Sequence, residues 1–139
     1  MSALFSPLQV GDLRLENRIV VAPMCQYSAE DGCMTDWHLI HLGNLSHSGA
    51  ALLTIEATAV TPEGRVSYGD VGLWSDENEA AMASVLASVR RWSQMPTVVR
   101  LRHLATVLGL IPSSRLNVAS EACDRCIAAR TTCVVVALP

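Results

Sequence analysis

Side chains with varied chemistry follow directly on a short apolar run near the start of the chain. They are a thioether, a thiol, an amide and a phenol, carried by Met24, Cys25, Gln26 and Tyr27. The run before them, residues 19–22, is rich in β-branched residues and predicts a buried strand. Pro23 ends that strand because proline cannot donate to a sheet ladder. In α/β folds binding and catalytic groups gather at such strand ends, and an ordinary loop is the alternative.

The elements around these residues alternate between strand and helix patterns. Two short extended pieces on either side of Gly11 and Asp12 predict a β-hairpin. The remaining patterns are two strands and two helices: residues 51–57 and 97–101 for strands, residues 36–48 and a segment from Ser75 to before Pro96 for helices. Because helical crossovers join parallel strands, this order predicts a parallel α/β sheet. Both a doubly wound sheet and a (β/α)8 barrel are built in this way.

Each predicted helix carries an apolar face that should pack on the sheet. The first is expected to pack through Trp37, Leu39, Ile40, Leu42 and Leu45. The second is expected to pack through Met82, Val85, Leu86, Val89 and Trp92. The acidic first turn of the second helix and its basic last turn both suit the helix dipole.

Composition narrows the classes of function. The chain has 139 residues, of which half are hydrophobic and 17% are charged, and its net charge is −3. This charge gives no reason to expect binding to nucleic acid or to an anionic membrane. No apolar run reaches the roughly 18 residues of a membrane span. The five cysteines, without a secretory signal pattern, point to reduced thiols and a cytoplasmic location.

Other candidate ligands are weaker. Cys123, Cys126 and Cys133 could serve a small redox or metal site, but no second cysteine pair stands at zinc spacing, so we predict no metal site. His38 and His41 form a lone His-x-x-His on a helix, which is typical of surface or packing residues. We interpret Glu56 and Asp70 as structural or solvated. The glycine patterns of Rossmann and Walker sites are absent from the sequence.

Residues 1–103 contain a series of short motifs in an order that resembles the Old Yellow Enzyme family of flavin-dependent ene-reductases. The likeness is greatest to the bacterial branch that carries a cysteine beside the flavin. The motifs lie at residues 4–7, 15–20, 22–27, 36–38, 56–60, 62–65 and 73–76. The resemblance implies the N-terminal portion of a (β/α)8 TIM barrel, about three βα units preceded by the hairpin. It also implies non-covalent FMN and NAD(P)H-driven reduction of the C=C bond of α,β-unsaturated carbonyl compounds.

The same resemblance assigns roles to individual residues. Ala22, Pro23, Met24 and Cys25 would lie along the isoalloxazine ring, and Ala57 would meet its polar edge through the backbone. Tyr27 would line the pocket for a small-molecule enone. Arg100 stands where the family has a glutamine whose amide contacts the flavin, and its charge would favour a reduced anionic flavin. A cysteine near the flavin can tune its potential, whereas a small buried hydrophobe is the alternative for Cys25. No catalytic residue is predicted.

The resemblance stops at about residue 103. Residues 104–139 are a motif-poor tail, for which we hypothesise a shifted reading frame or a gene fusion. A complete barrel takes about 250 residues, so we expect an incomplete barrel with an open strand edge. We therefore expect the chain alone to bind FMN weakly or not at all. The alternative is a non-catalytic interaction module, forming a homo-oligomer or associating with a full-length homologue.

Overall fold

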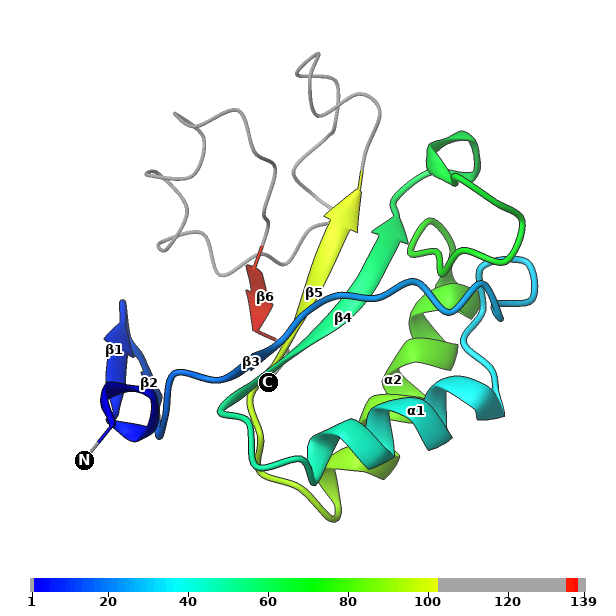
Figure 1. Ribbon diagram of the computed structural model, residues 1–139. Helices are drawn as coiled ribbons and strands as arrows, with labels where there is room; N and C mark the ends of the chain where they lie inside the picture. Colours follow the sequence, from blue (N-terminus) through cyan, green and yellow to red (C-terminus); the bar gives the residue numbers. More distant parts are fainter. Residues whose placement is uncertain (1, 103–134, 138–139) are drawn as a thin grey trace, which may run out of the picture.

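The computed structural model describes residues 2–102 and 135–137 (Figure 1). The tail cysteines and the apolar stretch 104–112 lie outside these residues. After a single 3-10 turn at Ala3–Phe5, strands β1 (Leu8–Val10) and β2 (Leu13–Leu15) pair antiparallel. Gly11 joins them with a φ of 57°, a left-handed conformation that glycine adopts without steric cost. The predicted hairpin is therefore confirmed.

The main sheet has four strands in the order β3-β4-β5-β6. Strands β3 (Val20–Val21), β4 (Leu52–Ala59) and β5 (Thr97–Arg102) are parallel neighbours, as predicted from the helical crossovers. Strand β3 is shorter than the predicted strand at residues 19–22, and β4 runs two residues past the predicted end at residue 57. The register of β4 against β5 shifts between Ile55 and Ala57.

The far edge of β5 differs from the expectation of an open edge. Strand β6 (Val135–Ala137) pairs antiparallel with β5, placing Val136 opposite Val99 and Val135 opposite Arg100. An unpaired strand edge presents free backbone donors and acceptors, and a valine-rich segment from the end of the chain satisfies part of them here. The pairing has the opposite direction to the other strand pairs of this sheet.

Helices α1 (Asp36–Ser46) and α2 (Asp76–Arg90) pack on one face of this sheet (Figure 1). The Ser75 hydroxyl accepts a hydrogen bond from the backbone N–H of Asn78 at 3.3 Å, which caps α2 at the residue where we expected the helix to begin. The buried core between the helices and the sheet is formed by Leu42, Leu53, Ile55, Met82, Val85, Leu86, Val89, Val99 and Leu101, among others. This core fixes β4 and β5 against the helices.

The predicted packing faces were partly wrong. Trp37, Leu39 and Ile40 are exposed, so α1 buries a narrower stripe than we predicted. The reason is that α1 packs against β4 and α2, whereas on its outer face the Trp37 indole only donates a hydrogen bond to the Gln26 amide and stays exposed. Trp92 is 80% exposed because it follows the last residue of α2 and no longer continues the helical spacing.

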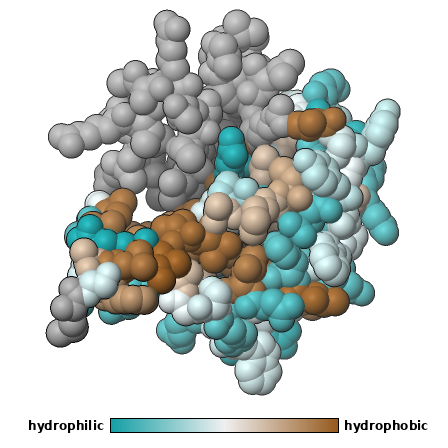
Figure 2. Space-filling view, in the orientation of Figure 1, coloured by the Kyte–Doolittle hydropathy of each residue, from teal (hydrophilic) through white to brown (hydrophobic). Residues whose placement is uncertain are grey.

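Apolar side chains also gather over the hairpin and β3, as Figure 2 shows on one face of the molecule. The exposed large apolar residues of this part are Leu4, Phe5, Val10 and Val20. We call these four residues the hairpin patch. Within the described residues, no helix combines the length and the apolar character needed to cross a membrane.

Candidate functional site

The carboxyl ends of β3, β4 and β5 lie along one edge of the sheet because the three strands are parallel. Val21 pairs with Leu53, so the chain leaving β3 runs beside β4 (Figure 1). Further along β4, Ala57 pairs with Arg100 of β5. The register of β4 and β5 places Ala57 beside Arg100, and a hydrogen bond from the Gln26 backbone to Glu56 brings segment 22–26 to the same edge. We call this edge, formed by segment 22–26, Ala57 and Arg100, the rim.

Gln26 holds the segment after β3 in place through its backbone and its side chain. Its backbone N–H donates to Oε2 of Glu56 at 2.9 Å. Its side-chain Nε2 donates to the carbonyl oxygen of Met24 at 2.9 Å, and its Oε1 accepts from the indole N–H of Trp37 at 3.1 Å. Sequence reasoning gave Gln26 no specific role, because a single amide in a loop has no spacing pattern that marks it.

The residues predicted to lie along a flavin ring differ in their exposure. Ala22 and Arg100 are exposed, whereas Pro23, Cys25 and Ala57 are half-buried. Met24 is 49% exposed. The two alanines have small side chains, which suit close approach of a flat ring. These residues line one edge, so the described part of the chain fits one wall of a flavin-ring site.

Tyr27, the predicted substrate-pocket residue, has a backbone of unusual conformation. Its φ is 54°, in the left-handed region that non-glycine residues rarely adopt, and its side chain is 62% exposed. Gly69 packs directly against it, since a Cβ built on Gly69 would lie 2.3 Å from the Tyr27 carbonyl oxygen. The Ala29 N–H donates to the Gly69 carbonyl at 2.9 Å, which holds the two loops together. Backbone strain of this kind often marks functional sites.

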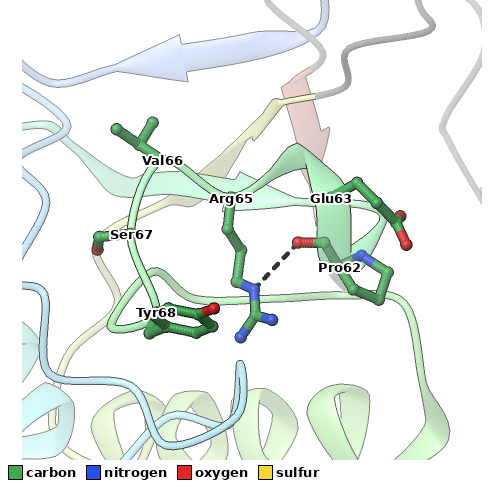
Figure 3. A pocket seen from close by; sticks show the side chains of 6 residues that line it. All are labelled: Pro62, Glu63, Arg65, Val66, Ser67 and Tyr68. Carbon is green, nitrogen blue, oxygen red and sulfur yellow. Dashed lines mark hydrogen bonds between the residues drawn. The ribbon is translucent and has the colours of Figure 1, made fainter.

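The loop after β4 forms a shallow cavity of about 370 Å³ around Arg65 (Figure 3). The Arg65 guanidinium lies 5.4 Å from the Tyr68 ring centroid and 5.0 Å from that of Trp74. Its Nε donates to the Pro62 carbonyl at 3.0 Å, the dashed line in Figure 3. Its Nη1 lies 3.6 Å from a carboxylate oxygen of Asp31. The Arg65 side chain thus makes polar and cation–π contacts that connect the loop after β4 with the loop that contains Asp31.

Glu56 and Asp70, which we interpreted as structural or solvated, are both buried, so the structural alternative holds and the solvated one is wrong. Asp70 accepts hydrogen bonds from the Val66 N–H at 2.7 Å and the Ser67 hydroxyl at 2.8 Å, which shapes the loop and confirms the interpretation. Glu56 lies beside His38, whose Nε2 is 3.3 Å from Glu56 Oε1. His38 is a packing residue, as predicted. In the sequence, Glu56 stands out because it is a lone carboxylate within an apolar strand.

Metal chemistry finds no support in the described residues. No three of their histidine, cysteine, aspartate and glutamate side chains come together as a metal site. Cys33 is half-buried, and its thiol accepts a hydrogen bond from the Asn78 amide at 3.3 Å. The three tail cysteines fall outside the described part of the chain.

Known proteins match this chain over most of the described residues. The model of the NADH:flavin oxidoreductase / NADH oxidase family matches residues 3–108, more than half of the chain. An NADH:flavin oxidoreductase of Gibberella zeae is 49% identical over 73 residues, 52% of this chain and 18% of that protein. Morphinone reductase superposes with a TM-score of 0.65 and 31% identity, covering 73% of this chain and 26% of the other. The old yellow enzyme of Trypanosoma cruzi superposes with a TM-score of 0.63 and 26% identity, covering 73% and 27%.

These matches agree with the strand order and the helix-covered parallel sheet, which form part of a TIM barrel. The chain spans between about a fifth and about a quarter of the length of these relatives. Two of the motifs on which the resemblance rests, at residues 22–27 and 56–60, contribute to its rim. Within that span, the chain belongs to the NADH:flavin oxidoreductase / NADH oxidase family, with old yellow enzymes among its structural neighbours.

Proposed function

We propose that the rim is the flavin-ring side of an FMN-dependent, NAD(P)H-driven oxidoreductase acting on the C=C bond of α,β-unsaturated carbonyl compounds. The observation that carries this proposal is the alignment of segment 22–26, Ala57 and Arg100 along one edge of a parallel sheet. FMN, when bound, would accept hydride from the nicotinamide and pass it to the β-carbon of the enone.

The residues of this chain would hold and shape the ring site. Ala22, Pro23, Met24 and Cys25 would lie along the ring, and the Cys25 thiol would adjust the polarity beside it. The Ala57 backbone would meet the polar edge of the ring. Arg100, paired with Ala57, would supply positive charge at that edge. Tyr27, with its exposed phenol and constrained backbone, would line the enone pocket.

We also propose that this chain alone binds FMN weakly or not at all. In TIM barrels the phosphate commonly sits in loops after the last two strands. Three parallel strands of the described part supply one wall of the ring site, and a single arginine cannot replace a phosphate cradle. An absorbance spectrum of the purified chain, with and without added FMN, tests this. Weak or absent flavin bands support it, whereas yellow protein that releases FMN on heating contradicts it.

A control separates binding of the flavin ring from binding of its phosphate. Lumiflavin carries the ring without the phosphate, so its affinity for this chain should be no lower than that of FMN. Cys25→Ser should change the visible spectrum of any bound flavin, whereas Cys33→Ser should not. If neither flavin binds and a homologous complete barrel with the same rim does not bind either, the assignment of the rim is wrong.

The second candidate function is a non-catalytic interaction module that forms a homo-oligomer or associates with a full-length homologue. The observation that favours it is the exposed hairpin patch beside β3, which is an edge strand of the described sheet. Exposed apolar patches next to a free strand edge are common interaction sites. Size-exclusion chromatography with and without a homologue tests it, and Val20→Lys should weaken any association. A monomer that never co-elutes argues against this function.

We also propose that the family-like part of the chain ends at residue 103 and that residues 104–139 come from a shifted reading frame or a gene fusion. Translation of the gene in its other two frames tests the frameshift hypothesis. A continuation of the family motifs in another frame supports it, and motif-free sequence in both frames counts against it. A cytoplasmic location is likewise a proposal, to be tested by fractionation.

A further inference from the structure

A buried carboxylate joins the rim to the interior of the molecule. Glu56 accepts the Gln26 backbone N–H on Oε2 at 2.9 Å, and its Oε1 lies 3.3 Å from His38 Nε2. The side chains of Glu56 and His38 are 4% and 1% exposed. Burying a charge away from water is costly unless partners compensate it, so these two contacts must offset the desolvation of Glu56.

The hydrogen bonds around His38 assign its tautomer. The backbone N–H of Thr35 donates to His38 Nδ1 at 3.0 Å, so Nδ1 accepts and carries no proton. The neutral ring therefore has its proton on Nε2, on the side of Glu56. Nε2 makes no aligned hydrogen bond to the described residues, so the carboxylate is its electrostatic partner at this distance. His38 is the third residue of α1, which links the start of that helix to β4.

The Glu56 contact lies beyond the end of β3. The regular pairing of β3 with β4 ends at Val21, whereas the rim segment continues to Gln26. The carboxylate thus ties the chain to β4 where the sheet no longer does. Cys25 lies directly before the residue that Glu56 holds.

We propose that Glu56 and His38 are positioning residues, which set the place of the Cys25–Gln26 backbone at the rim without touching a reacting atom. The role at a flavin rests on the proposed function, but the positioning of the segment can be measured without flavin. The carboxylate is suited to this task because it offers acceptors to two donors at once.

Glu56→Gln tests this arrangement with little change in shape. A glutamine has one acceptor oxygen and one amino group, while both partners of Glu56 are donors. The amide therefore either turns its amino group toward the Gln26 N–H, which loses its acceptor, or turns it toward His38 Nε2, which loses its electrostatic partner. Glu79→Gln, at an exposed position in the first turn of α2, is the matched control. His38→Asn is a second variant, since it keeps an acceptor near the Thr35 N–H but cannot reach Glu56.

The measurement is the alkylation rate of Cys25 by iodoacetamide in the full chain, resolved by tandem mass spectrometry. Cys33 in the same molecule is the internal reference, because it is also half-buried and lies on a turn that Asn78 anchors separately. We expect Glu56→Gln to raise the ratio of the Cys25 rate to the Cys33 rate by about tenfold, since a buried hydrogen bond to a charged group is lost. His38→Asn should raise it by a smaller factor, and Glu79→Gln should not change it.

The outcomes separate a positioning role from a general structural one. A purely structural role would raise both alkylation rates together and leave their ratio unchanged, which would overturn the proposal, as would no change in either rate. If Glu56→Gln does not fold by circular dichroism, His38→Asn decides by the same ratio. Added FMN forms a separate arm in a homologous complete barrel with the same rim: protection of the equivalent cysteine supports the flavin site, and no protection there counts against the proposed function. The ratio measured in this chain still decides on positioning.

Discussion

The substitution Leu53→Ala tests whether packing against the helices stabilises the sheet. Leu53 is fully buried in the core between β4 and the helices. Truncating a buried leucine to alanine removes transfer free energy and leaves a cavity, so we expect the free energy of unfolding to fall by about 3 kcal/mol or more. For a chain of 139 residues each kcal/mol corresponds to about 4 °C, so the melting temperature should fall by about 12 °C. Urea unfolding and thermal melts followed by circular dichroism measure both.

Leu52→Ala is the matched control in the same strand. Leu52 is half-buried and, because side chains alternate along a strand, it faces away from the helices. Its truncation should cost about 1 kcal/mol, since less apolar surface is uncovered. If Leu52→Ala and Leu53→Ala destabilise the chain equally, the conclusion that the helices and the core lie on one face of β4 is refuted.

Other substitutions test the loops and the caps. Arg65→Met should lower the free energy of unfolding by about 1–2 kcal/mol in urea titrations, because two cation–π contacts are lost; no loss would show that these contacts carry no net stability. Gly72→Ala should cost about 1–3 kcal/mol, because its Cβ would lie 2.1 Å from the neighbouring indole ring. A Cβ added at Gly43 in α1 would have no atom within 4 Å, so Gly43→Ala should raise the free energy of unfolding by about 0.5–1 kcal/mol. If Gly43→Ala destabilised the chain more than Gly72→Ala, the packing described at these two glycines would be contradicted. The Ser75 side chain and then the Glu77 backbone N–H hold the pKa of Glu77 below its usual value. The stability that this ionised Glu77 contributes is complete above its usual pKa and is lost as the pH falls through its lowered pKa. In the Ser75→Ala variant the pKa of Glu77, measured by NMR titration, should return toward its usual value. An unchanged pKa would exclude Ser75 as the cause.

Local sequence signals predicted the elements well where those signals are strong. Gly11 required a turn with positive φ, and the hairpin forms there. Ser75 caps α2, and Met82, Val85 and Leu86 point into the core as their spacing predicted. The faces of α1 were predicted less well. A helix with apolar residues on several sides shows which residues can be buried, but only its neighbours determine which of them are.

The candidate site likewise has features that local sequence predicts and features that only contacts between distant segments determine. The motifs placed Cys25 and Ala57 at the ends of two strands, and parallel pairing alone brings such ends to one edge. The sequence did not predict that Glu56 would hold the Gln26 backbone, because that bond joins residues 30 positions apart in the chain. Nor did it predict that β6 would pair antiparallel with β5, since a short valine run carries no information on the direction of its partner.

The sequence by itself determined the order of the predicted strands and helices, the start of α2 and the family to which the chain belongs. These depend on periodicity, capping and short motifs, all of which lie within a few neighbouring residues. Tertiary structure alone decided the exposure of Trp37 and Ile40, the left-handed backbone of Tyr27 beside Gly69, and the tie from His38 through Glu56 to the rim. Such features arise where segments distant in sequence meet, and their free energies depend on distances that no local pattern specifies.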